Sequence, residues 1–329
     1  MILLFLFFLI TEFINSENIY LSPNGGKTIQ QALDEAGPGQ TIFLSPGIYY
    51  QDTVSKRSGT ADSPIKIIGG KDAVVKGSGN SKIFEINHDH IVLDGFTIDG
   101  LDGSPDRKEN YRDMLIYITG GIDIKILNMD IKNAGGECVR LKYFSQKNEI
   151  AHNNIENCGV YDFKFKSGGK NGEGIYIGTA PEQLDRNPTR DLDASSYNHI
   201  HHNLIDTRGN EGVDIKEGSS GNIVEYNIVT GQKDSESAGL DSRGDENIFR
   251  HNEVYGSFGA GIRLGGDLYN NIQFGKNNSA YENKLYDNAY GAIKIQAFPQ
   301  GKICANAVSG NGDGSGTYGA KINIESPCR

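Results

Sequence analysis

"HNLI", residues 202–205, is followed 24 residues later by "YNIV", residues 226–229. In both stretches a branched aliphatic residue follows two positions after an Asn, and the same pattern recurs at Asn153, Asn252, Asn283 and Asn306. The successive Asn spacings are 50, 24, 25, 31 and 23 residues, and "LNMDI" adds Asn128, 25 residues before Asn153. Repeats of this length with short strands must stack on one another to bury their apolar sides. The sequence therefore predicts a right-handed parallel β-helix, an all-β solenoid whose Asn side chains stack and hydrogen-bond inside successive coils.

Two other repeat architectures fit the sequence less well. Propeller blades are roughly 40 residues long and carry four strands, so the period found here is too short for them. Leucine-rich solenoids have a similar spacing but need a Leu-dense consensus, which this chain lacks. The 43 Gly residues and the absence of Trp suit many tight turns and short strands. The composition thus favours the parallel β-helix.

The N-terminal region contains two segments with different predicted roles, a signal peptide and a capping helix. Residues 1–16, "MILLFLFFLITEFINS", read as a secretory signal peptide, with a membrane anchor as the alternative. The apolar block is too short to span a bilayer, which takes roughly 20 apolar residues. We therefore expect a secreted, extracellular protein whose residues 17–329 form one β-helix domain. Within "TIQQALDEAGPGQTIFLSPGIY", residues 28–49, we expect an N-terminal capping helix that buries Ile29, Ala32 and Leu33.

The four cysteines form an even set in a chain that we expect to reach an oxidising compartment. Their spacings favour a disulfide between Cys138 and Cys158 and another between Cys304 and Cys328. The sequence alone permits three connectivities. Free buried cysteines are the alternative.

The formal net charge of −10 argues against nucleic acid and anionic membranes as partners, because both reward a basic surface. An acidic polysaccharide would need a local basic strip or a bridging cation on such a protein. We expect a monomer.

Aligning the strand that follows each Gly-marked turn produces columns of residues. Side chains alternate along a strand, which gives an inward column of Val139, Ile175, Val213, Leu240, Ile262 and Ile293. The next positions give an outward column of Arg140, Tyr176, Asp214, Asp241, Arg263 and Lys294. Two residues further on, the outward positions are Lys142, Gly178, Lys216, Arg243, Gly265 and Gln296. Before the strands, an acidic row consists of Glu137, Glu173 and Glu211.

These columns predict a solvent-facing patch on which Lys216 and Arg243 are neighbours, with Asp214 and Asp241 beside them, because parallel strands lie about 4.8 Å apart. Insertions at residues 160–172 and 180–197 break the period and are candidate walls of a ligand cleft. The alternative is a ladder of surface salt bridges, each contributing roughly 0 to 1 kcal/mol. Like charges in the acidic row favour a bound cation.

At these residues the chain resembles polysaccharide lyase family 6, which includes chondroitinase B and alginate lyases. The resemblance covers the N-terminal "AGPGQTIFLSPGIY" and "GT…PIKI" at residues 59–67, and the pattern of Glu211, Lys216, Asn222 and Arg243. The chain departs from the family at Gly209, where the family has a second acid, and after Lys216 and Arg243, where the family has Ser and His-Gly.

The resemblance implies β-elimination on a uronic-acid-containing polysaccharide, with Lys216 as base, Arg243 as its assistant and Ca²⁺ as a cofactor. A base needs a pKa near the working pH, and we expect neighbouring cations to lower the pKa of Lys216. Glu211, Glu173 and Asp214 are the oxygen ligands that Ca²⁺ prefers. We assign five further outward residues to substrate binding: Tyr176, which is also a candidate acid, Asp241, Arg263, Lys142 and Arg140.

Two other functions remain open. Asp214 and Asp241 form a carboxylate pair of the kind that glycoside hydrolases use, although the Asn-Thr-Asp, Asp-Asp and Gly-His-Gly motifs of polygalacturonases are absent. A non-catalytic carbohydrate-binding or cell-surface protein would keep the solenoid and the charged strip without needing a base. The histidines His88, His90, His201, His202 and His251 show no pair with metal-ligand spacing.

Overall fold

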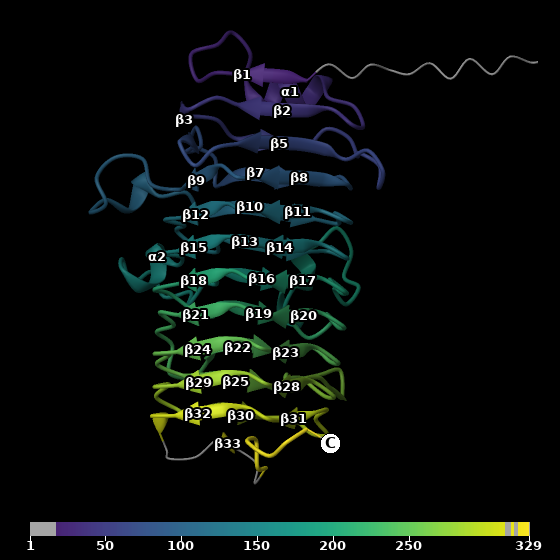
Figure 1. The fold of residues 1–329 in the computed structure, drawn as a ribbon, viewed down its shortest axis with the longest axis vertical. Coiled ribbons are helices and arrows are strands. Elements are labelled where there is room, and N and C mark those ends of the chain that lie inside the picture. Colours follow the sequence, from purple (N-terminus) through teal and green to yellow (C-terminus); the bar gives the residue numbers. More distant parts are fainter. Residues whose placement is uncertain (1–17, 313–316, 319–321, 329) are drawn as a thin grey trace, which may run out of the picture.

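A computed structural model describes residues 18–312, 317–318 and 322–328, in which short strands stack as successive coils (Figure 1). The predicted signal peptide, residues 1–16, lies outside the described residues. Three long sheets, here called sheets A, B and C, run along the stack, and every strand pairing within them is parallel. The prediction of an all-β right-handed parallel β-helix is confirmed.

Sheet A has eleven strands, most of three or four residues. Its strands alternate in burial: in β17, for example, Ile200 points into the core between two partly exposed histidines. In order they are β1 (Ile19–Leu21), β2 (Thr41–Leu44), β5 (Ile65–Gly69), β8 (Ile91–Asp94), β11 (Lys125–Leu127), β14 (Glu149–Ala151), β17 (His199–His201), β20 (Ile223–Glu225), β23 (Ile248–Arg250), β28 (Ser279–Tyr281) and β31 (Ile303–Cys304).

Sheet B follows sheet A in each coil after a sharp corner. Most of its ten strands place one aliphatic or aromatic residue each toward the core. They are β3 (Gly47–Tyr49), β6 (Ala73–Val75), β9 (Thr97–Asp99), β12 (Asp130–Lys132), β15 (Asn154–Glu156), β18 (Leu204–Asp206), β21 (Ile228–Thr230), β24 (Glu253–Tyr255), β29 (Lys284–Tyr286) and β32 (Ala307–Ser309).

Sheet C carries the predicted columns. Its ten strands are β4 (Thr53–Val54), β7 (Lys82–Ile86), β10 (Met114–Thr119), β13 (Val139–Lys142), β16 (Ile175–Ile177), β19 (Val213–Ile215), β22 (Ala238–Ser242), β25 (Ala260–Leu264), β30 (Ile293–Ile295) and β33 (Thr317–Tyr318). The predicted inward column lies in one register through β13, β16, β19, β22, β25 and β30, and its six residues are all fully buried. The predicted alignment of these strands is therefore confirmed.

The few elements outside the three sheets are short. Two small helices, α2 (Val160–Phe163) and the 3-10 helix η2 (Pro181–Arg186), lie in the two predicted insertions, and a hairpin of β26 (Leu268–Tyr269) and β27 (Ile272–Gln273) follows β25. A further 3-10 helix, η1 (Lys108–Asn110), precedes β10. In the described part of the chain, no helix has the length and apolar character needed to cross a membrane.

Helix α1 (Ile29–Glu35) lies at the N-terminal end of the stack (Figure 1). Thr28 caps its N-terminus: the Thr28 hydroxyl accepts from the backbone N–H of Gln31, and the Gln31 side chain accepts from the backbone N–H of Thr28, which satisfies two otherwise free N–H groups. Ile29, Ala32 and Leu33 are buried, as the sequence predicts. That the helix protects the first coil from edge pairing stays a prediction.

The recurring Asn residues form a buried ladder at the corner between sheets A and B. The side-chain amide of each donates to the amide oxygen of the next at 2.9–3.1 Å, in the order Asn153, Asn203, Asn227, Asn252, Asn283 and Asn306. Asn128 does not belong to it, because Met129 occupies the ladder position and donates its backbone N–H to Asn153. Asn128 instead adopts a left-handed backbone conformation (φ 53°) and bonds Asp94. Its inclusion in the repeat was wrong by one residue.

A second Asn ladder, which the sequence analysis missed, lies at the corner between sheets C and A. Asn148, Asn198, Asn222 and Asn247 are buried, and each of the first three donates its side-chain amide to the next at 2.9 Å. The backbone N–H of Asn247 continues the series to Asn278. Each of these residues precedes a member of the first ladder by five positions, a signal that the sequence contains. Asn222, part of the family pattern, therefore has a structural role here.

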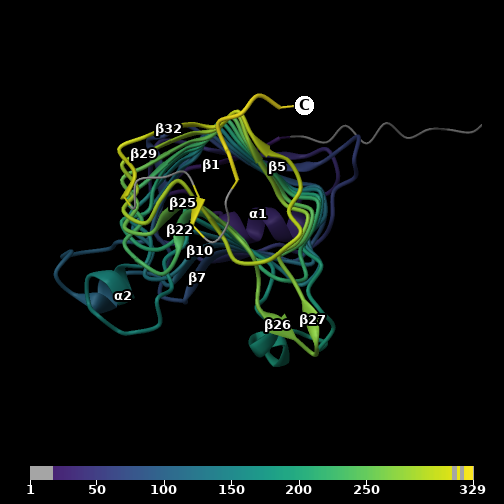
Figure 2. The same cartoon turned by 90° about the horizontal axis from the view of Figure 1, so that it is seen from below.

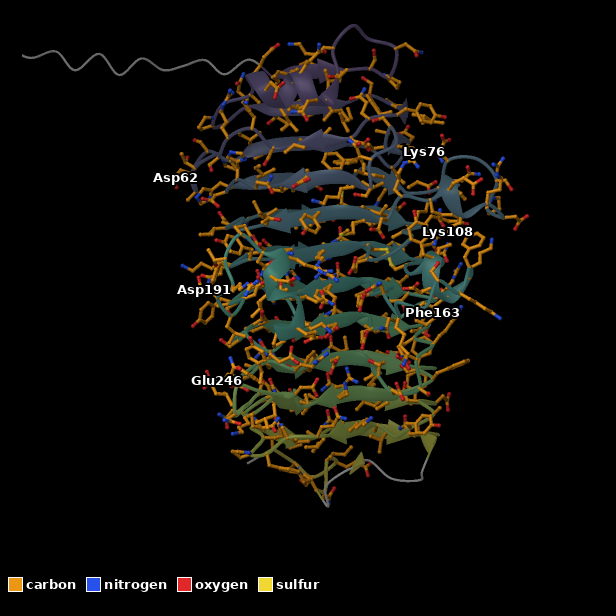
Figure 3. All side chains as sticks on the ribbon, turned by 180° about the vertical axis from the view of Figure 1, so that it is seen from behind. Asp62, Lys76, Lys108, Phe163, Asp191 and Glu246 are labelled. Carbon is orange, nitrogen blue, oxygen red and sulfur yellow. A yellow bond between two sulfur atoms is a disulfide. The ribbon has the colours of Figure 1, made fainter. Side chains whose placement is uncertain are left out.

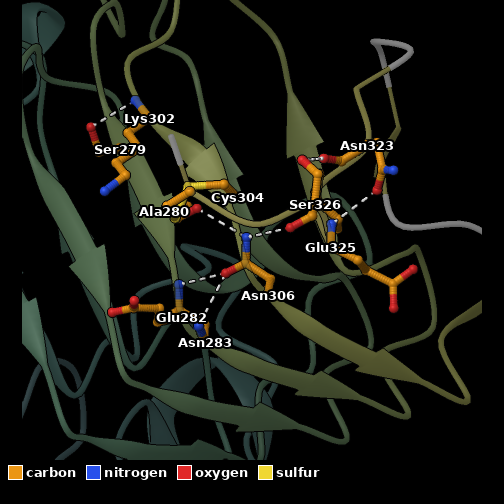
Figure 4. Close-up of a disulfide and its surroundings, with 12 residues drawn as sticks. Ser279, Ala280, Glu282, Asn283, Lys302, Cys304, Asn306, Asn323, Glu325 and Ser326 are labelled. Carbon is orange, nitrogen blue, oxygen red and sulfur yellow. Dashed lines mark hydrogen bonds between the residues drawn. A yellow bond between two sulfur atoms is a disulfide. The ribbon is translucent and has the colours of Figure 1, made fainter.

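The two predicted disulfides are both present. Cys138 bonds Cys158, and Cys304 bonds Cys328. Figure 4 shows the second bond beside Asn306, the last residue of the first ladder, whose side chain also donates to the backbone oxygens of Ala280 and Ile324. The C-terminal segment is thus held to the last coils by covalent and hydrogen bonds.

Candidate active site on sheet C

The predicted outward column lies on the outer face of sheet C. Arg140, Tyr176, Asp214, Asp241, Arg263 and Lys294 follow one another in register through six neighbouring strands. The column that begins with Lys142 continues the same register, because the backbone N–H of Lys216 bonds Ile177 and that of Arg243 bonds Ile215. The structure therefore brings together all ten predicted site residues from five strands and the turns next to them.

Two projections flank this face. Seen along the solenoid, α2 lies on one side of strands β7, β10, β22 and β25, and the hairpin β26–β27 lies on the other (Figure 2). Figure 3 places Phe163 of α2 and Asp191 of the second insertion on opposite sides of the same coils. Asp193, fully buried, anchors the second insertion by accepting from the backbone of Tyr143 and Phe144 at 2.6 and 3.0 Å. The insertions thus have the positions expected of cleft walls.

Tyr176 lies between two cations. The Arg140 guanidinium is 4.2 Å from the centre of its ring, and the Lys216 ammonium is 4.7 Å from it. Both distances are within the range of cation–π attraction. Burial raises the pKa of Tyr176, so its hydroxyl stays protonated at neutral pH.

Lys216 is paired with Asp214, its neighbour two residues earlier in the chain. Nζ of Lys216 lies 2.5 Å from Oδ2 of Asp214, and both side chains are almost fully buried. Burial is the largest single influence and lowers the pKa of Lys216, but the charges of Asp214, Tyr176 and Glu211 together outweigh burial and raise this pKa. The expectation that neighbouring cations lower this pKa was wrong, because it omitted the closest charge. Lys216 is therefore protonated at neutral pH.

Arg243 follows Lys216 in the column but contacts different carboxylates. Its Nη2 lies 2.5 Å from Oε1 of Glu217 and 2.6 Å from Oδ2 of Asp267. The Glu217 side chain is fully buried, and burial raises its pKa despite the guanidinium. The sequence analysis gave Glu217 no role, although its position next to Lys216 on a turn places it within reach of the following coil.

The three predicted metal ligands meet in one buried cluster. One carboxylate oxygen each from Glu173, Glu211 and Asp214 lies within 4.8 Å of the others. Burial, followed by the charges of Glu137 and Asp214, raises the pKa of Glu173 to about 8, and burial raises that of Glu211 well above its usual range. Oε2 of Glu211 is buried without a hydrogen-bond partner among the described residues. Three converging carboxylates fit the hard, oxygen-rich coordination of Ca²⁺.

Arg263 crosses the column to reach two acids. Its guanidinium forms a bidentate ion pair with Asp241, and Nη2 also lies 3.5 Å from Oε1 of Glu211. Glu211 additionally accepts from the hydroxyl of Ser237. Burial raises the pKa of Asp241, although the guanidinium opposes this. Because Asp214 and Asp241 are each bound to a cation, they do not form the free carboxylate pair of a hydrolase.

Lys142 and Glu137 complete the site at β13. Glu137 binds Arg140 at 2.6 Å. Burial, and then the Arg140 guanidinium, lower the pKa of Lys142 to about 8. Lys142, which we assigned to substrate binding, is therefore a lysine of this face whose pKa is brought toward neutrality, and burial also lowers the pKa of Lys294 at β30.

The charges of the site are arranged in two layers. The acidic side chains Glu137, Glu217, Asp214 and Asp241 are only 0–5% exposed, whereas the cations Arg140, Lys216, Arg243 and Arg263 above them are 9–16% exposed. These pairs are not the surface salt bridges of the alternative interpretation, because they are largely desolvated. The predicted open patch is also more covered than expected, and the groups that reach solvent are mainly cationic.

No protein-family model and no curated protein sequence matches the chain. Solved structures of similar fold include an alginate lyase from Paenibacillus sp. str. FPU-7, which is 20% identical with a TM-score of 0.68 over 92% of this chain and 96% of that one. The pectate lyase Pel9A is 14% identical, with a TM-score of 0.64 over 94% of this chain and 81% of that one. A mannuronic-acid-specific family 6 polysaccharide lyase from the human gut microbiota is 18% identical, with a TM-score of 0.51 over 84% and 67%.

These likenesses establish the class to which the fold belongs, the parallel β-helix that is also found in polysaccharide lyases. The predicted resemblance to such lyases is thereby confirmed for the fold. At these identities the reaction has to be argued from the residues of the site.

Proposed function

We propose that the protein is a secreted polysaccharide lyase that cleaves a uronic-acid-containing polysaccharide by β-elimination on the outer face of sheet C. The observation that carries the proposal is the layer of cations above buried carboxylates. Glu173 and Glu211 have raised pKa values, so near neutral pH their negative charge is reduced and the cations attract an anion. A uronate polymer supplies repeated carboxylates that such a strip can bind.

In the proposed reaction, Lys216 removes the proton from the carbon that bears the uronate carboxylate. The electron pair left on that carbon forms a double bond to the neighbouring carbon as its glycosidic C–O bond breaks. Tyr176, which is protonated and lies beside Lys216, gives its proton to the leaving oxygen. Arg243 stabilises the negative charge that develops on the carboxylate. Arg140, Lys142 and Arg263 bind and orient the substrate. Asp241, which we expected to bind the substrate, is fully buried and instead positions Arg263.

Lys216 must lose its own proton before it can act as the base. Its pair with Asp214 opposes this, so we expect the activity to rise toward alkaline pH. Lys142, with its pKa of about 8, is the second candidate base on the same face. Replacing each lysine in turn with Ala decides between them, because only the base is indispensable for elimination.

Glu173, Glu211 and Asp214 would hold a Ca²⁺ ion. Bound there, the ion would supply positive charge that neutralises a uronate carboxylate. If this role is correct, Glu173→Gln should bind Ca²⁺ more weakly in calorimetry, and chelation should reduce cleavage by the wild type. Unchanged Ca²⁺ binding by Glu173→Gln would contradict the ligand assignment.

Secretion and an acidic polysaccharide partner belong to the same proposal. The two disulfides fit an oxidising compartment. The named neighbours include enzymes of alginate and pectate. A periplasmic or exported fraction that contains the mature chain, beginning near residue 17, would support the predicted signal peptide.

The function is tested by incubating the protein with alginate, pectate and chondroitin, with and without a chelator. Elimination creates an unsaturated sugar end, so we expect ultraviolet absorbance to increase with at least one polymer. New reducing ends without that absorbance would indicate a hydrolase. Binding to a polymer without any product would favour the non-catalytic alternative. Either of these two results would overturn the proposal.

A further inference from the structure

Three histidines converge at the corner between sheets A and B. His152 follows β14 and His202 follows β17, which is its neighbour in sheet A. Both residues have a left-handed backbone (φ 59° and 54°), and both directly precede a ladder residue, Asn153 or Asn203. This shared local geometry stacks their rings, with centres 4.9 Å apart. His201, the last residue of β17, lies against both rings.

We propose that His152, His201 and His202 bind a divalent first-row transition metal ion, at a site separate from the charged face of sheet C. One ring nitrogen from each histidine lies within 4.8 Å of the others. Imidazole nitrogen is a preferred ligand of Zn²⁺, Ni²⁺ and Cu²⁺, whereas Ca²⁺ prefers oxygen. This site therefore selects a different class of ion from the carboxylate cluster.

The hydrogen bonds of His201 support this assignment. Nε2 of His201 lies 3.3 Å from Oε1 of Glu149, so a proton on Nε2 is bound by the carboxylate. Nδ1 of His201 is then left with a lone pair, and it lies 2.9 Å from Nδ1 of His202. A carboxylate that orients a histidine while the other ring nitrogen binds a metal is a recurring arrangement in metal sites.

The separation of these two nitrogens matches a shared ion. Two imidazole nitrogens, each about 2.1 Å from one ion, lie about 3 Å apart at the right angle of a square-planar or octahedral site and about 3.4 Å apart at a tetrahedral angle, so the separation fits Ni²⁺ or Cu²⁺ better than Zn²⁺. Without a proton or an ion between them, two facing lone pairs repel each other. A metal ion between His201 and His202 removes this repulsion, and His152 offers a third ligand from the adjacent coil.

The site is rigid and accessible. The ring of His202 is stacked between His152 and Tyr226, and Tyr226 stacks in turn on His251. His152 and His202 are exposed. His202 also borders a surface depression, whose other lining residues include Tyr226, His251 and Glu282. Ring stacking therefore orders the ligands beforehand, while solvent can reach the remaining coordination positions.

The test uses the mature protein without an affinity tag and stripped of metal. Calorimetric titration with Ni²⁺ and, separately, with Zn²⁺ should show one saturable site for at least one ion. His201→Ala and His202→Ala should each weaken binding at least tenfold. His251→Ala is the matched control, because its ring belongs to the same stack but is separated from His202 by Tyr226. It should leave the affinity unchanged.

A second measurement keeps the test valid if a variant folds poorly. Since His152 and His201 lie on neighbouring coils, bound metal should raise the thermal unfolding temperature of the wild type and not that of His202→Ala. Glu149→Gln, which removes a positioning group, should weaken binding less than either histidine variant. The proposal is contradicted if neither ion binds saturably, or if binding survives in both histidine variants. Either result leaves the lyase proposal untouched, because Lys216 and its partners lie on sheet C.

Discussion

The Asn ladder between sheets A and B and the charged site on sheet C are both buried sets of polar side chains, and they differ in how fully their members are hydrogen-bonded. In the Asn ladder between sheets A and B, each amide donates to the next, and the donors and acceptors are neutral. On sheet C, the outward column and the acidic row beside it consist mainly of charged groups, with a raised carboxyl pKa at Glu173 and an unpartnered oxygen on Glu211. A self-satisfied column stabilises the fold, whereas desolvated charges are costly and indicate a site completed from outside.

The largest effect should come from Lys216→Ala, which removes the proposed base. We expect the elimination rate to fall by about 100-fold or more, the usual contribution of a general base. Absorbance assays on the polymer that the wild type cleaves measure this loss. Lys56→Ala, at an exposed lysine far along the stack, is the control and should keep full activity. Comparable activity in both variants would transfer the role of base to another residue.

Asn227→Ala breaks the other column. The Asn227 side chain accepts from Asn203 and donates to Asn252, so its loss leaves buried amide groups without partners. The free energy of unfolding should fall by about 3 kcal/mol, measured by denaturant unfolding. The folded fraction should keep its activity. Asn24→Ala, at an exposed site, should change stability by less than about 0.5 kcal/mol. Equal destabilisation by the two variants would refute the structural role of the ladder.

Asp214→Asn tests the charge that raises the pKa of Lys216. Removal of the carboxylate should lower this pKa, so the deprotonated lysine is reached at lower pH. If Lys216 is the base, the rising limb of the pH–rate profile moves toward lower pH. If the lysine has to be protonated, the falling limb moves instead. Measuring kcat/KM across the alkaline range in chelator-treated and Ca²⁺-supplemented samples separates this effect from any loss of a metal ligand.

The smallest effect is expected for an exposed ion pair. Lys27 and Glu35 lie 2.6 Å apart next to α1, but their side chains are 41% and 59% exposed. Glu35→Gln should therefore change the free energy of unfolding by less than about 0.5 kcal/mol. A larger loss of unfolding free energy would show that exposed ion pairs also stabilise this protein, and the contrast with the buried charges of sheet C would be weaker.

Much of this architecture could be predicted from the sequence because the chain repeats. Once the coils are aligned on their turns, alternation along each strand places Val213 inward and Asp214 outward, and the structure has both. The same register brings Glu173, Glu211 and Asp214 into one cluster. Both disulfides could be predicted for a related reason: each connects cysteines about one coil apart.

Other features depend on geometry that strand alternation does not contain. Asn128 differs from a ladder residue by one position, and only the left-handed corner conformation distinguishes them. The pairing of Lys216 with Asp214 depends on the direction in which the two side chains point above the sheet. The predicted shift in the pKa of Lys216 therefore had the wrong direction. His152 and His202 are 50 residues apart because an insertion lengthens one coil. Known sequence motifs of metal ligands have much shorter separations along the chain, so they could not predict this pair.

The central claim is that the outer face of sheet C cleaves a glycosidic bond by elimination and not by hydrolysis. The mass of the products tests this claim most directly. The polymer that the protein cleaves is digested, and the oligosaccharide products are weighed by mass spectrometry. Elimination adds no water, so we predict products whose new non-reducing end is unsaturated and whose mass is lower by one water molecule than that of the corresponding saturated oligosaccharides. Saturated products that have gained one water molecule for each cleaved bond would contradict the account.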